Sequence, residues 1–149
     1  MDYVLRKAKS SDTIRIEELF VEMLKAIHHT DDVEGYETGY LDKFFLDKED
    51  WICVAEYEND VVAFLSIEVY RDGGFIYLDD LSVADRCRNK GIGTKLIHAA
   101  EKYAREIGIT KIVFHVDKAN EDAYRLYLRL GYSEDADEVS RIRMNKSVK

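Results

Sequence analysis

The seven residues Arg88-Asn89-Lys90-Gly91-Ile92-Gly93-Thr94 carry the strongest local signal in the chain. They lie between a predicted strand that ends near Val83 and an amphipathic helix that begins at about Ile92. Glycines at 91 and 93 have no side chain, so backbone amides there can approach an anion, and the helix N-terminus adds partial positive charge. This pattern predicts a diphosphate site at the start of the helix.

The loop is also a basic island in an acidic chain. Four cations gather near it, whereas the whole chain has 22 Lys and Arg against 30 Asp and Glu, a net charge of −8. These cations are Arg86, Arg88, Lys90 and Lys95. The spacing excludes the two common nucleotide loops, because it matches neither G-x-x-x-x-G-K-[ST] nor G-x-G-x-x-G. For the two glycines alone, a plain left-handed turn before a helix is the alternative interpretation.

The segments after the loop predict a parallel crossover. Apolar residues recur at helical spacing over 92–107, Gly108 ends this helix, and an apolar strand follows at 111–116. A further helix stripe runs over 119–130, and residues 141–144 supply a last strand. A strand–helix–strand unit of this kind joins parallel strands.

The segments before the loop predict helices followed by an antiparallel meander. A short strand at about 3–8 leads to a helix with an apolar stripe from Ile16 to Ile27, and a second short helix follows near 40–45. From Trp51 the hydrophobic period changes to two, which predicts three strands joined by tight turns. These strands span 51–57, 61–70 and 75–83. The whole pattern predicts an α/β fold with a mixed sheet.

Two motifs resemble those of one family. Arg88, Gly91 and Gly93 match the R/Q-x-x-G-x-G/A acetyl-CoA loop of the GNAT superfamily of N-acetyltransferases. A second stretch, Asn120-x-x-Ala123-x-x-Leu126-Tyr127-x-x-x-Gly131-Tyr132, is similar to the family's N-x-x-A-x-x-L-Y-x-x-x-G-F. The resemblance covers nearly the whole chain. It implies the GNAT fold, a mixed central sheet of about six to seven strands flanked by about four helices, as one domain over residues 1–149.

The resemblance also implies how acetyl-CoA binds. The strand before the loop would splay from its neighbour and pair with the pantetheine arm, and amides of the loop would hold the pyrophosphate. The cofactor-binding residues implied are Leu81, Ser82, Val83, Arg88, Asn89, Lys90, Gly91, Ile92, Gly93, Thr94, Asn120 and Tyr127. Asn89 stands where the family often has glycine, but asparagine adopts the left-handed conformation at modest cost.

Three residues are candidates for proton transfer. Tyr127 matches the family's tyrosine that protonates the departing CoA thiolate, and a phenol with a pKa near 10 keeps its proton at neutral pH. Asp79 and Asp80 are similar to the acidic pair of polyamine and other amine acetyltransferases, where the first acid is a proposed base. We therefore expect Asp79 to be the base and Asp80 the second choice. The alternative interpretations are that Tyr127 only packs in the core, and that one of the two aspartates merely faces solvent. Strand alternation predicts that the two carboxylates point to opposite faces.

Acidic residues favour a cationic acceptor. In the family the segment between the first two helices often borders the acceptor, and this chain is acidic there. The substrate-binding residues expected are Asp31, Asp32, Glu34, Tyr36 and Asp79. His115 is a rival base, although a packed or surface histidine is the simpler interpretation. A second acidic run, formed by Glu134, Asp135, Asp137 and Glu138, is interpreted as a solvated turn.

The sequence therefore predicts an acetyl-CoA-dependent N-acetyltransferase that acts by direct transfer, in a ternary complex, on a primary amine of a small molecule. The acidic balance argues against nucleic acid, and no stretch approaches the roughly 20 apolar residues that cross a membrane. No Cys/His cluster has metal-ligand spacing, and no apolar run resembles a signal peptide, which favours the cytoplasm. An acetyltransferase of protein N-termini or lysines, and a non-catalytic acetyl-CoA sensor, are the alternatives. Exposed strand edges can pair with a second copy of the chain, so a homodimer is compatible with the sequence.

Overall fold

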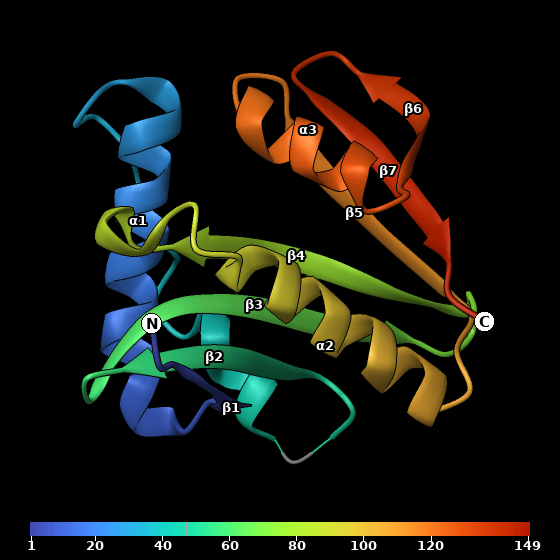
Figure 1. Ribbon diagram of the computed structural model, residues 1–149, viewed down its shortest axis with the longest axis horizontal. Coiled ribbons are helices and arrows are strands. Elements are labelled where there is room, and N and C mark those ends of the chain that lie inside the picture. Colours follow the sequence, from blue (N-terminus) through green and yellow to red (C-terminus); the bar gives the residue numbers. More distant parts are fainter. Residues whose placement is uncertain (47) are drawn as a thin grey trace.

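A computed structural model describes residues 1–46 and 48–149, which are arranged around a twisted seven-stranded sheet (Figure 1). The strands lie in the order β1-β2-β3-β4-β5-β7-β6. They span Val4–Lys7 (β1), Trp51–Tyr57 (β2), Asp60–Tyr70 (β3), Phe75–Val83 (β4), Lys111–Asp117 (β5), Ser133–Glu138 (β6) and Arg141–Ser147 (β7). Only the β4–β5 pair is parallel among these strands, so the predicted mixed sheet with one crossover is confirmed.

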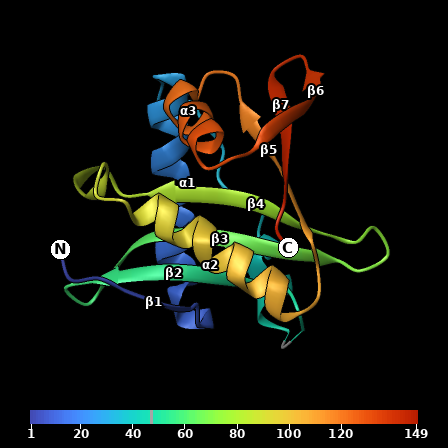
Figure 2. The same cartoon turned by 45° about the vertical axis from the view of Figure 1, so that its right-hand side comes forward.

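Helices cover both faces of the sheet. In the described residues there are three α-helices and three short 3-10 helices. They span Thr13–His28 (α1), Ile92–Glu106 (α2), Glu121–Arg129 (α3), Ser10–Asp12 (η1), Tyr40–Phe45 (η2) and Asp85–Cys87 (η3). Figure 2 shows α2 crossing one face of the central strands and α1 behind the other. None of these helices combines the length and the apolar character that a membrane span requires.

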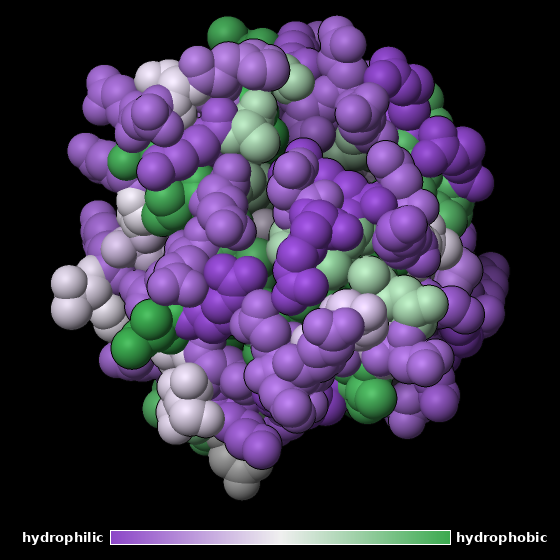
Figure 3. Space-filling model, turned by 60° about the vertical axis from the view of Figure 1, so that its left-hand side comes forward, coloured by the Kyte–Doolittle hydropathy of each residue, from purple (hydrophilic) through white to green (hydrophobic). Residues whose placement is uncertain are grey.

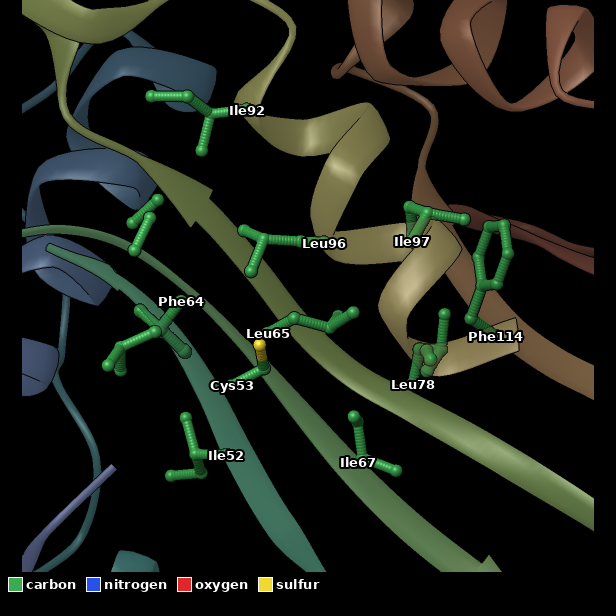
Figure 4. Packing of buried hydrophobic residues seen from close by; sticks show 14 of the residues in the cluster. Ile52, Cys53, Phe64, Leu65, Ile67, Leu78, Ile92, Leu96, Ile97 and Phe114 are labelled. Atoms are coloured by element: carbon green, nitrogen blue, oxygen red, sulfur yellow. The ribbon is translucent and has the colours of Figure 1, made fainter. Parts of the chain in front are cut away.

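The main core lies between α2 and the sheet (Figure 4). Leu96 and Ile97 point from α2 toward Leu65 and Leu78 of the strands, and all four are at most 4% exposed. Fully burying one such side chain contributes about 1.5–3 kcal/mol relative to leaving it in water. On the opposite face α1 buries Ile16 and Leu19. These contacts fix both helices against β4, whose C-terminal half carries the site described below.

Two irregularities of β4 shape that half. Its pairing with β5 stops at Leu78↔Phe114, although β4 continues to Val83, so the two strands separate there as the resemblance implied. On the other side, β3 pairs Leu65 with Leu81 and Ile67 with Leu78. Two residues of β4, at 79 and 80, therefore face one residue of β3, which is the geometry of a β-bulge.

The acidic run after α3 corrects one prediction from the sequence. Glu134, Asp135, Asp137 and Glu138 were expected in a solvated turn, but they lie on the edge strand β6. This strand pairs antiparallel with the basic strand β7. Asp135 accepts hydrogen bonds from Arg143 at 2.5 Å and from Asn145 at 2.6 Å. Cross-strand pairs of opposite charge thus stabilise a strand whose composition has poor β propensity.

Candidate active site

A groove of about 760 Å³ opens where the end of β4, the start of α2, the end of α1 and α3 meet. Its walls contain every predicted cofactor-binding residue except Lys90, which is exposed outside them. Those in the walls are Leu81, Ser82, Val83, Arg88, Asn89, Gly91, Ile92, Gly93, Thr94, Asn120 and Tyr127. The sequence therefore predicted residues that the fold brings together from three separate segments.

The loop in front of α2 has the backbone geometry of an anion cradle. Gly91 caps the helix with φ of 79°, and Asn89 is also left-handed with φ of 59°. The first helical hydrogen bond runs from the Lys95 amide to the Gly91 carbonyl at 3.1 Å. The amides of the residues between them therefore lack a helical partner and can donate to an anion. A Cβ built on Gly91 meets no atom within 4 Å, so the space beside it is open.

Positive charge surrounds this cradle. Arg88, Lys90 and Lys95 are all exposed, and the only ion pair among them joins Arg88 to Asp85 at 3.7 Å within the described residues. An exposed pair at that distance contributes little, so Arg88 remains available to an anion. The residues present thus fit a diphosphate at this helix N-terminus.

Two polar residues of the groove also hold the fold. Asn120 caps α3, and its Oδ1 accepts a hydrogen bond from the Ala123 amide at 3.4 Å. The Ser82 hydroxyl, which is buried, donates to the Leu19 carbonyl of α1 at 2.9 Å. The Ser82 side chain is therefore turned away from any ligand, which leaves its backbone as the part that can pair with one.

Tyr127 lies where the groove meets a second, smaller cavity of about 30 Å³. Its ring packs against Phe114 at 4.3 Å between centroids, and the residue is 8% exposed. No hydrogen bond of its hydroxyl is found within residues 1–46 and 48–149. Burial, and then the charge of Asp80, raise the pKa of Tyr127, so the phenol keeps its proton at neutral pH. Core packing and a free proton donor are thus combined in one side chain.

The β-bulge brings the two acidic residues together and corrects the prediction from strand alternation. Asp80 accepts a hydrogen bond from the Tyr36 hydroxyl at 2.6 Å, and Asp79 accepts one from Tyr40 at 2.5 Å. The two tyrosine rings are stacked 4.8 Å apart. Both carboxylates therefore face the stretch from Tyr36 to the first residue of η2, because the extra residue of the bulge cancels the usual alternation.

The environment makes Asp80 an acid with a pKa near neutrality. Burial, and then the negative charge of Asp79, raise the pKa of Asp80 from 3.8 to about 7. The hydrogen bond from Tyr36 acts in the opposite direction and does not overcome these two effects. A carboxyl group with this pKa exchanges its proton readily near pH 7, as a general base requires.

Around the pair lies a ring of aromatic and charged groups. Phe20 of α1 stacks on Tyr36 at 3.9 Å between centroids, which continues the stack with Tyr40. Glu68 of β3, 8% exposed, binds the Lys43 ammonium at 2.6 Å. Lys43 also lies 4.7 Å from the centroid of the Tyr40 ring. The Lys43 ammonium is thus held by a carboxylate and an aromatic ring, and groups of the same kind would hold a cationic ligand.

The expected substrate-binding residues divide into two groups. Tyr36 and Asp79 lie in the site, whereas Asp31, Asp32 and Glu34 are exposed on the loop after α1 and line neither cavity. Sequence reasoning missed Tyr40, Lys43 and Glu68. Tyr40 was read only as part of a short helix, and no local pattern relates it to Tyr36, since residues 32–37 form no helix.

His115 is neither a surface nor a simple packed histidine. It contacts the second cavity, which it shares with Asp79 and Tyr127. Its Nδ1 lies 2.5 Å from the Tyr77 hydroxyl, and its Nε2 lies 3.2 Å from the carboxylate of Glu138. The sequence placed His115 on a strand but gave no sign of either partner.

The described part of the chain, which omits only residue 47, has no group of three or more His, Cys, Asp or Glu side chains that could hold a metal ion. The face seen in Figure 3 is mostly hydrophilic, with small separate hydrophobic spots. The titratable groups gathered at the site are the carboxylate pair, the two tyrosines that bind it, Tyr127 and His115.

Comparisons with known proteins find one family. The model of the acetyltransferase (GNAT) family matches residues 2–132. The uncharacterized N-acetyltransferase YhfO of Bacillus subtilis is 31% identical over 88% of this chain and 90% of that protein. The D-amino-acid N-acetyltransferase HPA3 of Saccharomyces cerevisiae is 34% identical over 58% of this chain and 50% of that protein.

A solved structure has the same fold. The PaiA N-acetyltransferase of Thermoplasma acidophilum, crystallised in complex with coenzyme A, superimposes with a TM-score of 0.81 at 19% identity and covers 99% of both chains. At that identity the likeness concerns the fold. It extends over the sheet, the helices and the segments that form the groove described above.

Proposed function

The chain belongs to the acetyltransferase (GNAT) family and is an acetyl-CoA-dependent N-acetyltransferase, and we propose that its acceptor is a primary amine on a small, cationic molecule. The acetyl group passes directly from the thioester to the amine within a ternary complex. The observation that carries this proposal is the carboxylate pair of β4: Asp79 lines a small cavity together with Tyr127, and burial and the charge of Asp79 raise the pKa of the neighbouring Asp80 to about 7.

The donor half of the reaction uses the groove. Amides at the start of α2, with Arg88 beside them, would hold the pyrophosphate, and the free backbone edge of β4 from Leu81 to Val83 would pair with the pantetheine arm. This edge is free because β4 and β5 separate after Leu78. Acetyl-CoA supplies the activated acyl group, and the thioester would then lie near Tyr127, where the groove meets the smaller cavity.

The acceptor half uses the acid pair. An alkylammonium must lose a proton before its nitrogen can attack a carbonyl carbon. We assign to Asp80 the acceptance of this proton, because its raised pKa suits the exchange. We assign to the ionised Asp79 the binding of the ammonium. The nitrogen then attacks the thioester carbon, the C–S bond breaks, and the thiolate takes the proton of Tyr127. The second proton that the nitrogen sheds as the amide forms passes to solvent, and solvent reprotonates Tyr127.

Charge supports a cationic acceptor. Asp79, Asp80 and Glu68 lie on one side of the sheet, where Lys43 binds Glu68 and offsets one of the three charges. The relative HPA3 carries D-amino acid in its name, so its named acceptor is a small molecule with an amine. The exposed loop acids Asp31 and Asp32 would add a longer-range attraction for cations.

Two other functions remain as candidates to be tested against this one. An acetyltransferase of protein N-termini or lysines needs a groove that admits an extended peptide. A sensor of acetyl-CoA needs neither Asp80 nor a tyrosine with a free hydroxyl, so the combination of these two groups favours catalysis.

The experiment is release of CoA thiol from acetyl-CoA across polyamines, aminoglycosides, amino acids and short N-terminal peptides. Tyr127→Phe is the matched control, since it keeps the packed ring and removes the proton donor. We expect turnover with small cationic amines and a large loss in the variant. Turnover with peptides alone would replace the proposal by protein acetylation, and tight acetyl-CoA binding without any turnover would favour the sensor.

A further inference from the structure

Ser66 is a fully buried polar side chain that the proposed reaction does not use. It is 0% exposed in the middle of β3, where its two neighbours along the strand pair with Leu78 and Leu81 of β4. On the other side of β3, Ser66 pairs regularly with Ile52 of β2. The irregularity is therefore confined to the β4 side, where Ser66 faces the two residues of the bulge.

The Ser66 hydroxyl makes hydrogen bonds with the backbone of the bulge. It accepts one from the Asp80 amide at 3.0 Å, and it donates a longer one to the Asp80 carbonyl at 3.4 Å. A bulge interrupts the backbone ladder and leaves polar groups of the extra residue without their usual partners. A serine has both a donor and an acceptor, so this one side chain can serve both groups. An apolar residue at this position could serve neither.

These hydrogen bonds favour the irregular register over the regular one. A buried amide is costly without a partner, and removal of the hydroxyl would take one from the Asp80 amide. In a regular register Asp80 would turn to the opposite face of the sheet, because side chains alternate along a strand. That face carries Leu65 and Leu78, which pack under α2. Ser66 thus helps to keep a carboxylate out of the main core and on the side of Tyr36.

We propose that Ser66 is a positioning residue of the reaction: by holding the bulge, it keeps the Asp80 carboxylate beside Asp79 and Tyr36, where Asp80 accepts the proton of the acceptor amine. Ser66 acts through Asp80 and touches neither substrate, since it lines neither the groove nor the smaller cavity. The inference rests on the proposed function, whose base it helps to place.

The pH dependence of the reaction can reveal this role, because Ser66 itself carries no titratable group. Burial and the charge of Asp79 raise the pKa of Asp80 from 3.8 to about 7, and the hydrogen bond from Tyr36 opposes them. Loosening of the bulge weakens the two larger effects, so it moves the pKa back toward 3.8. A Ser66 variant leaves in place the other titratable groups that interact with the acid pair, namely Glu68 of β3, Lys43 and Tyr40 of η2, Tyr77 of β4 and Tyr127 of α3.

The first test measures the ionisation of Asp80 without turnover. Carbon-13 spectra of the side-chain carboxyl groups, recorded from about pH 5 to about pH 9, give its pKa in the wild type and in Ser66→Ala. The resonance is identified by its loss in Asp80→Asn. We expect the pKa to fall by about one unit in Ser66→Ala. An unchanged pKa, in a variant that circular dichroism shows to be folded, would overturn the inference.

The second test follows the reaction. The rising limb of kcat/KM against pH reports the pKa of an essential base in the free enzyme. In Ser66→Ala we expect the midpoint of this limb to fall with the pKa of Asp80, and kcat to fall about tenfold, while the KM for acetyl-CoA is unchanged. Ser66→Cys keeps nearly the same shape, but its sulfur is a weak acceptor, so its midpoint should lie between those of the wild type and Ser66→Ala.

The matched control is Ser82→Ala. It also removes a buried hydroxyl that bonds to the backbone, in this case to the Leu19 carbonyl of α1. The pKa of Asp80 and the midpoint of the limb should both stay at their wild-type values. Equal shifts in the two alanine variants would attribute the effect to general loosening of the fold and would refute a specific role of Ser66.

The remaining outcomes separate this inference from the proposed function. If the wild type acetylates amines and Ser66→Ala changes neither the pKa of Asp80 nor the midpoint, the inference fails and the proposed function stands. If the pKa of Asp80 falls while the midpoint stays, Asp80 is not the base, and Ser66 does not position one. A wild type that acetylates no amine would end the proposed function and this inference with it.

Discussion

Replacing Asp80 by asparagine should stabilise the protein at neutral and higher pH while it removes the proposed base. The ionised Asp80 carboxylate is disfavoured by burial and by the charge of Asp79, which together raise its pKa from 3.8 to about 7. Asparagine has nearly the same shape, carries no charge, and can still accept the hydrogen bond from Tyr36. The variant should therefore lose activity and gain stability together.

The magnitude follows from the difference between the two pKa values. A folded-state pKa of about 7 against an ordinary value of 3.8 corresponds to about 4 kcal/mol, at 1.36 kcal/mol for each pKa unit. Asparagine accepts a weaker hydrogen bond from Tyr36 than a carboxylate does, which offsets about 1 kcal/mol. The net gain in the free energy of unfolding at about pH 8 should therefore be about 3 kcal/mol.

The sign of the pH dependence is fixed by the same pKa values. Between pH 3.8 and about 7 the unfolded chain has ionised this carboxyl group while the folded protein still holds the proton. The folded state binds more protons in that window, so the contribution of Asp80 to stability is full below pH 3.8 and is lost as pH rises through about 7. The stability difference between variant and wild type should grow across this window and then level off.

Urea unfolding of both proteins, followed by circular dichroism at several pH values from about 4 to 8, measures this difference. Asp32→Asn is the matched control, because Asp32 is exposed on the loop after α1, and its effect should be small at every pH. Asp79→Asn should lower the pKa of Asp80 and move the window to lower pH. A stability difference for Asp80→Asn that does not vary with pH would refute the reasoning.

Three further variants test other parts of the structure. Tyr127→Phe should lower kcat by about a hundredfold, while the Kd for acetyl-CoA measured by calorimetry stays within about twofold. Gly91→Val should abolish acetyl-CoA binding in the same assay, because a branched side chain at φ of 79° distorts the cradle; retained affinity would refute the placement of the pyrophosphate. Val139→Asn should raise the free energy of unfolding by about 1 kcal/mol, since Val139 is 90% exposed with φ of 66°, and thermal denaturation would detect it; an unchanged or lower value would show that the turn carries no strain.

Most of the fold was accessible from the sequence because its signals are local. The change of hydrophobic period at Trp51 correctly predicted the start of the meander, and the apolar stripe after Gly91 correctly predicted α2. The strand β6 was missed, since Asp135 and its neighbours have little β propensity. Their pairing with Arg143 and the rest of β7 depends on tertiary contacts that no local pattern contains.

The grouping of the residues on the donor side was predictable for the same reason, and that of the acceptor side only in part, since Tyr36 and Asp79 were expected there and Tyr40 and Glu68 were not. The residues from Arg88 to Thr94 are contiguous, so one motif contains both the loop geometry and its charge. The acceptor side is assembled from Tyr36, Tyr40, Glu68 and His115, which are far apart in the sequence. Spacing cannot indicate that a tyrosine after α1 binds a carboxylate on β4.

The bulge at Asp79 and Asp80 connects the fold to the proposed chemistry. In a regular strand the two carboxylates would point to opposite faces, and the charge of one would act weakly on the pKa of the other. The extra residue places both beside Tyr36 and Tyr40, where mutual repulsion and burial disfavour the charge of Asp80. The local break in alternation therefore adds the charge of Asp79 to the burial that raises the pKa of Asp80, and a change that removed the bulge should lower that pKa. Sites at which a regular pattern fails are where functional groups are to be expected.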